Sequence, residues 1–132
     1  MRREHLVPLS KQAVQILQQV AEISGGERLV FPSQNNPNKP MSENTLLFAI
    51  YRMGYHSRAT THGFRSVAST ILNESEKWHP DAIERQLAHV ESNKVRAAYD
   101  RAEHLPERRR MMKWWADHLD SMMGEKKITM WE

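Results

Sequence analysis

Four residues suited to phosphate chemistry follow one another along the chain. His62 and Arg65 stand three positions apart in THGFRSVAST, His89 lies in QLAHV, and Tyr99 lies in AAYDRA. A tyrosine phenol becomes a covalent nucleophile once its proton is removed. An arginine can hold a phosphate through two hydrogen bonds and stays charged, and histidines can transfer the proton or donate to the same oxygens. The set is therefore suited to attack of a tyrosine on a phosphodiester.

Each of these residues also has a simpler interpretation when it is taken alone. A histidine and an arginine at i and i+3 neighbour one another on a helix surface and can make purely local hydrogen bonds. Tyr99 shares a helix face with Val95, Ala98 and Ala102, which suits a tyrosine buried in a core. The order of all four residues together is what favours a phosphate-binding site.

The elements that must position these residues are mostly helical. Apolar residues at helical spacing, preceded by capping residues such as Ser10 and Ser42, predict six helices. Their expected ranges are 11–23, 43–53, 61 through at least 72, 80–89, 93–103 and 106–123. EHLVPLS reads as a short strand that needs a partner, and PSQNNPNKPMS reads as a loop. We therefore predict a mainly α (α+β) fold with a remnant of a small β-sheet.

Composition narrows the class of protein. A chain of 132 residues suits one domain, and the absence of cysteine excludes disulfides and a cysteine nucleophile. No apolar run reaches the length of a membrane span, and the first residues lack a signal-peptide core, so an intracellular location is expected. The net charge of +3 permits an anionic partner without requiring one.

Three segments in order carry a family resemblance. HGFRSVAST, QLAHV and AAYDRAEHLPERRRMMKWWADHLD together resemble the C-terminal half of the catalytic domain of tyrosine recombinases, specifically the phage and prophage integrases. The resemblance runs from Glu4 to Met123 and implies a catalytic portion over residues 1–124, followed by a polar tail over 125–132. It implies DNA integration and excision through a 3′-phosphotyrosyl intermediate, with no metal and no other cofactor.

The resemblance assigns a role to each of the four residues. Tyr99 matches the nucleophile, and Arg65 matches the second phosphate-binding arginine. His62 matches the histidine that is a general acid/base candidate, and His89 matches a hydrogen-bond donor to the scissile phosphate. EHLVPLS matches the end of the family's β-hairpin.

Two catalytic residues of the family have no match in this chain. The first active-site arginine lies well upstream of the strand, and Arg2 and Arg3 are too close to it. The family's lysine lies on the β-hairpin, whereas the first lysine here is Lys11, inside a predicted helix. We therefore expect a truncated catalytic domain whose cleavage of DNA is very weak or absent on its own.

The resemblance also implies partners and a cellular location. Double-stranded attachment-site DNA is the expected partner, together with other protomers of the same integrase, in the bacterial cytoplasm at the nucleoid. The stripe formed by Trp114, Trp115, Leu119 and Met122 packs the last helix on a core or serves protomer association. Arg108, Arg109 and Arg110 contact phosphates or form a solvated face.

Other interpretations remain open from the sequence. The chain could be a catalytically silent DNA-binding or assembly module that kept the fold, or a structural helical domain in which the four residues are coincidental. Tyr51 and Tyr55 are rival tyrosines, but no arginine and histidine frame surrounds them in sequence. The remaining histidines show no metal-ligand spacing, so a metal site is not expected.

Overall fold

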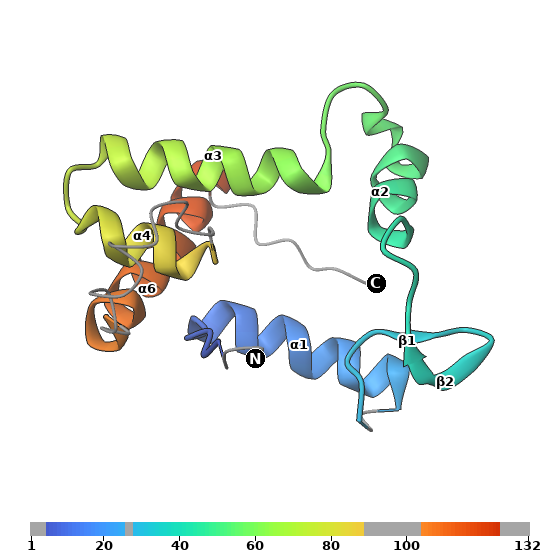
Figure 1. Cartoon of the computed structure of the whole chain (residues 1–132). Coiled ribbons are helices and arrows are strands. Elements are labelled where there is room, and N and C mark those ends of the chain that lie inside the picture. Colours follow the sequence, from blue (N-terminus) through green and yellow to red (C-terminus); the bar gives the residue numbers. More distant parts are fainter. Residues whose placement is uncertain (1–4, 26–27, 89–103, 125–132) are drawn as a thin grey trace, which may run out of the picture. The chain divides into compact units, whose positions relative to one another are not determined.

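A computed structural model describes residues 5–25, 28–88 and 104–124 (Figure 1). The chain divides into two compact units, one made of Met1–Ala13 and Leu72–Glu132 and the other of Val14–Ile71. Predicted positions His89 and Tyr99 lie outside the described residues, as does the helix expected over 93–103. In the described residues no helix is long and apolar enough to cross a membrane.

Helices dominate the described part of the chain, as predicted. The elements in order are α1 (Lys11–Ser24), β1 (Pro32–Ser33), β2 (Asn36–Pro40), α2 (Thr45–Ile50), a π-helical turn η1 (Tyr51–Tyr55), α3 (Thr61–Glu74), α4 (Pro80–Gln86) and α6 (Leu105–Met123). The mainly α class with a small sheet is therefore confirmed.

Ser10 begins α1 as its sequence position predicts. Its hydroxyl accepts a hydrogen bond from the N–H of Ala13 at 3.1 Å, which satisfies one of the helix's free donors. Gly25 follows the helix with a φ of 88°, a backbone conformation that glycine adopts without steric cost. Both ends of α1 are thus explained by local residues.

The small sheet lies elsewhere than the sequence predicted. EHLVPLS is not a strand in its described residues, and the sheet consists of β1 and β2, paired antiparallel with Pro32 opposite Pro40. A strand needs a neighbouring strand to take up its backbone hydrogen bonds, and the carbonyl of Leu6 instead accepts from the side chain of Arg108. The prediction of a strand at 4–10 was wrong, and that of a plain loop at 32–42 was incomplete.

The second predicted helix is shorter than expected. It begins at Thr45, where Asn44 precedes it without a side-chain cap, and Ser42 makes a turn through its carbonyl to the N–H of Thr45 at 2.9 Å. After Ile50 the chain continues as η1, in which Gly54 has a φ of 87°. Ser42 is therefore not the cap, and the run ends at Tyr55, one residue after the predicted stop at Gly54, whose backbone is not helical.

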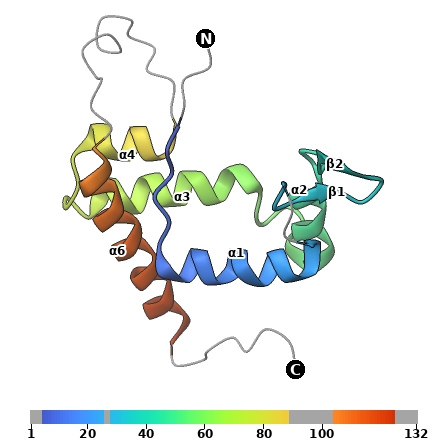
Figure 2. The ribbon, with the colours of Figure 1, turned by 90° about the horizontal axis from the view of Figure 1, so that it is seen from below.

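The hydrophobic core of the first unit is built from α4, α6 and the last residues of α3. Leu72, Ile83 and Met111 are at most 2% exposed, and they pack with partly buried aromatic and aliphatic residues, namely Trp78, Leu87, Trp114 and Trp115. The rings of Trp78 and Trp114 meet edge to face with centroids 6.1 Å apart. α4 lies directly against α6 in both ribbon views (Figures 1 and 2). This core holds the ends of the helices that flank residues 89–103.

The second unit buries fewer apolar side chains. Among its described residues only Ile50 is buried, whereas Leu46, Phe64 and Val67 are 49%, 62% and 53% exposed. Leu46 stands one helical turn before Ile50, on the same side of α2, and is nevertheless exposed. Helical spacing shows which side chains share a face, but burial of that face requires a second surface.

Candidate functional site

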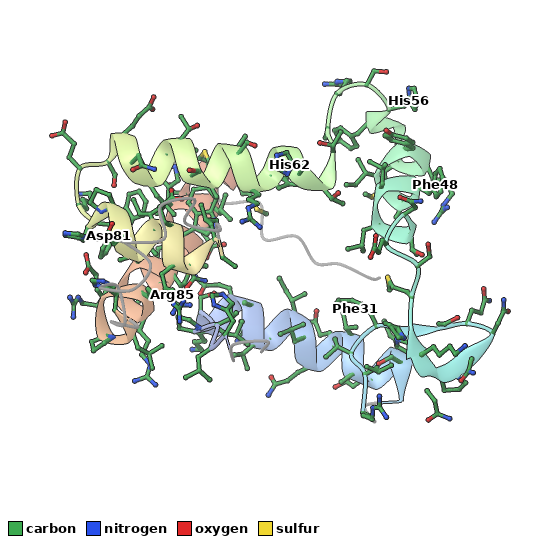
Figure 3. The ribbon with its side chains drawn as sticks, viewed as in Figure 1. Phe31, Phe48, His56, His62, Asp81 and Arg85 are labelled. Atoms are coloured by element: carbon green, nitrogen blue, oxygen red, sulfur yellow. The ribbon has the colours of Figure 1, made fainter. Side chains whose placement is uncertain are left out.

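His62 and Arg65 lie on the first turns of α3, as the sequence predicted (Figure 3 labels His62). Thr60 precedes the helix, and its Oγ1 accepts from the N–H of Gly63 at 3.0 Å while its carbonyl accepts from Phe64 at 3.3 Å. A threonine in this position stabilises the start of a helix. The cap therefore fixes the turn that carries His62.

The two side chains differ in their surroundings. His62 is exposed and Arg65 is half-buried, and they are separated by one helical turn on the same helix. The carbonyl of His62 accepts from the hydroxyl of Ser66 at 3.3 Å. Side-chain hydrogen bonds from Thr60 and from Ser66 therefore both hold the backbone of this turn. An exposed imidazole next to a partly sheltered guanidinium can meet an anion from solvent.

Residues of η1 and of the turn after it make aromatic contacts just before α3 begins. Arg58 places its guanidinium over the ring of Tyr55, 5.5 Å from the ring centroid, and the ring of Tyr51 lies 4.4 Å from that of His56. Tyr51 and Tyr55 are therefore engaged in aromatic contacts within their own segment. His56 lies in this turn and His62 on the helix that follows it (Figure 3).

His89 is not reached by the described part of α4. The helix was predicted to extend over 80–89, but it ends at Gln86, and Leu87 closes it with its N–H bonded to the carbonyl of Ile83 at 3.0 Å. Ala88 follows with a φ of 51°. The structure therefore describes the chain up to the residue before His89. Of the predicted set, the described residues include His62 and Arg65, which both lie on α3.

Arg108 has a structural role that was not predicted from the sequence. It is 0% exposed, whereas its neighbours Arg109 and Arg110 are exposed. Its Nε donates to Oε1 of Gln86 at 2.9 Å. One sequence signal was available: Arg108 stands three and seven positions before Met111 and Trp115, on the buried face of the helix. For Arg108, both the phosphate contact and the solvated face are excluded.

Among residues 5–25, 28–88 and 104–124, no group of three or more histidine, aspartate or glutamate side chains is arranged to hold a metal ion.

Comparison with known proteins establishes the family. The sequence model described as the phage integrase family matches residues 1–104. This chain belongs to the phage integrase family. It is 53% identical over 123 residues to the integrase of Enterobacteria phage P4, an alignment that covers 91% of this chain and 28% of that protein.

Two proteins of Escherichia coli K12 give the same result. Prophage integrase IntA is 50% identical over 117 residues, covering 89% of this chain and 28% of IntA. The putative protein IntB is 50% identical over 123 residues, covering 91% of this chain and 31% of IntB. The chain thus spans less than a third of the length of these curated relatives. No solved structure matches it.

Proposed function

We propose that this chain is the C-terminal part, over residues 1–124, of the catalytic domain of a tyrosine recombinase that integrates and excises phage or prophage DNA. The match to integrases along nine-tenths of the chain is the observation that supports this most strongly. The presentation of His62 and Arg65 on a capped helix start agrees with it.

The proposed reaction is a pair of transesterifications at one phosphate. The phenolic oxygen of Tyr99 attacks the phosphorus, a 3′-phosphotyrosyl bond forms, and the bond to the 5′ oxygen breaks, so that the 5′ oxygen leaves with a proton. The 5′-hydroxyl of a partner strand then attacks the phosphotyrosine and releases Tyr99. Bond energy is conserved in each step, so neither ATP nor a metal is required.

The roles of the other residues follow from their chemistry. Arg65 donates to the non-bridging oxygens, where negative charge accumulates in the transition state. His62 transfers a proton or holds it near the reacting oxygens, and His89 donates to the same phosphate. The partner is double-stranded attachment-site DNA.

The chain on its own is proposed to cleave DNA very weakly or not at all. The family's first arginine and its lysine have no counterpart within these 132 residues, so this stretch by itself supplies neither that phosphate clamp nor that proton donor. A catalytically silent DNA-binding or assembly module is the second candidate function.

Assembly and location complete the proposal. The last turns of α6 leave Leu119, Met122 and Met123 between 38% and 58% exposed, which supplies an apolar surface for a second protomer. Trp114 and Trp115 are partly buried against the core and are unsuited to that role. The proposed place of action is the bacterial nucleoid.

The decisive experiment is a covalent trap. A full-length recombinase that carries this chain is incubated with attachment-site DNA nicked next to the cleavage position, so that the released fragment diffuses away. A protein–DNA adduct on a denaturing gel, lost in Tyr99→Phe, supports the recombinase. An adduct that survives in Tyr99→Phe refutes the assignment, and salt-dependent binding without any adduct supports the silent module.

A further inference from the structure

Arg108 is a fully buried arginine that joins three segments of the first unit. Its Nε donates to Gln86 at the end of α4, one Nη donates to the carbonyl of Leu6 before α1, and its own backbone belongs to the first turn of α6. Removing a guanidinium from water is costly unless hydrogen bonds replace the lost solvation. The fold therefore buries a charged side chain at this junction, and its hydrogen bonds must compensate for the lost solvation.

The junction lies at the two points where residues 89–103 attach to the described fold. Gln86 is two residues before Ala88, and Arg108 is four residues after His104. Ala88 and His104 have φ values of 51° and 43°, in the left-handed region that non-glycine residues rarely adopt. Such conformations persist where the surrounding structure imposes them.

A second set of contacts fixes the starts of the same two helices. The N–H of His79 donates to Oε1 of Glu107 at 2.8 Å. The rings of His79 and His104 stack with centroids 5.6 Å apart and an interplanar angle of 11°. α4 is thus held against α6 at both of its ends, by His79 at the start and by Gln86 at the finish.

We propose that Arg108 is a positioning residue for the recombination reaction. Through Gln86 and Leu6 it sets the placement of the end of α4 relative to the start of α6, the two points between which the sequence carries His89 and Tyr99. The inference rests on the proposed function. Arg108 cannot touch DNA itself, because its side chain is buried. Its effect is expected to be large because a displacement of about 1 Å can slow an enzymatic step roughly a hundredfold.

Spin labels test the placement directly, without reference to activity. The chain has no cysteine, so labels on Ala88→Cys and Arg110→Cys, both exposed positions, are the only ones attached. Pulsed electron paramagnetic resonance then gives the distribution of distances between them. We expect a narrow distribution in the otherwise unchanged chain and a broadened or shifted one in Arg108→Met.

Matched variants separate positioning from folding. Arg109→Met removes an exposed neighbouring arginine and should leave the distribution unchanged. Gln86→Leu removes the acceptor while keeping Arg108 and should broaden it, whereas Gln86→Glu keeps an acceptor and should not. If circular dichroism shows that Arg108→Met does not fold, the comparison of Gln86→Leu with Gln86→Glu decides. Folded Arg108→Met or Gln86→Leu with the parent distribution overturns the proposal.

Kinetics in a full-length recombinase supply the second readout. Gln86→Leu should lower the single-turnover rate of adduct formation about tenfold or more at saturating DNA, with DNA affinity within about twofold of the parent. Gln86→Glu should restore the rate. If Tyr99→Phe still forms adduct, the proposed function fails; if Tyr99→Phe is inactive while Gln86→Leu reacts at the parent rate, only the positioning role fails.

Discussion

Thr60 accepts a hydrogen bond from the backbone N–H of Gly63 through its side-chain oxygen, at 3.0 Å. The bond spans His62 and satisfies a donor that the first turn of α3 would otherwise expose to solvent. Capping bonds of this kind are worth about 1 kcal/mol. The start of α3 is therefore a stabilised platform for the two predicted site residues on it.

Loss of this cap should be measurable. We expect Thr60→Ala to lower the free energy of unfolding by about 1 kcal/mol in a urea titration, because the alanine leaves the Gly63 donor unpaired. Thr60→Ser keeps the acceptor and should lose much less. Equal losses in the two variants would show that the threonine methyl group, and not the hydrogen bond, is what stabilises the turn.

The core around Ile83 gives a second prediction. Ile83 is 0% exposed and packs with Leu72 and Met111, so Ile83→Ala should cost about 2–5 kcal/mol of unfolding free energy. Ile23→Ala is the matched control, because that side chain is 78% exposed on α1. It should change stability by less than about 1 kcal/mol. Similar losses at the two positions would contradict the assigned core.

Much of the helical fold could be predicted because its causes are local. α1 follows from the cap at Ser10, an apolar stripe and Gly25, and α6 follows from Pro106 in its first turn, an apolar stripe and the polar tail that begins at Gly124. The observed end of α1 and the observed start of α6 each differ from the predicted ones by one residue. α4 ends earlier than predicted, because its last turn closes at Leu87. Local signals therefore fix where a helix begins better than where it ends.

Long-range features were not predictable in the same way. EHLVPLS has the composition of a strand, but a strand exists only where another strand pairs with it. Arg108 is one of three consecutive arginines. Its spacing from Met111 and Trp115 places it on the apolar face of α6, but its full burial depends on the packing around that face. Of the candidate site, α3 carries His62 and Arg65 as predicted, whereas the roles of His89 and Tyr99 stay predictions.

Acid should weaken the contact between α1 and α6 at Asp117. Hydrogen bonds from Lys113 and from Gln12 hold the pKa of this carboxyl below its ordinary value of 3.8. Lys113 Nζ lies 2.7 Å from Oδ2, and Gln12 Nε2 lies 3.0 Å from Oδ1. Since the folded state lowers the pKa, this stabilisation is present above 3.8 and is lost as the pH falls through the lower, folded-state value.

The comparison of Asp117→Asn with the parent chain measures that effect. At neutral pH the variant should be the less stable of the two, because the amide carries no charge for Lys113 to pair with. The difference should shrink as the pH drops below about 3.8, the ordinary carboxyl value. Lys113→Met should remove the larger part of the dependence. A difference that stays constant between pH 7 and pH 2 would show that Asp117 contributes through packing or polarity alone.

The last prediction concerns Arg65 and tests why an arginine occupies its position. A lysine keeps the positive charge but lacks the planar pair of donors that matches two phosphate oxygens. In a full-length recombinase carrying this chain, Arg65→Lys should therefore bind attachment-site DNA with nearly parent affinity and form adduct on the order of a hundredfold more slowly. Arg58→Lys is the control, because Arg58 lies over the Tyr55 ring and has no assigned part in the reaction.

Single-turnover adduct formation on nicked DNA, measured alongside equilibrium binding, separates the effect of Arg65→Lys on rate from its effect on affinity. If Arg65→Lys reacts at the parent rate, charge alone suffices and the bidentate role is refuted. If its binding falls in proportion to its rate, Arg65 holds DNA equally in the ground state and the transition state, which would make it a binding residue without a catalytic share.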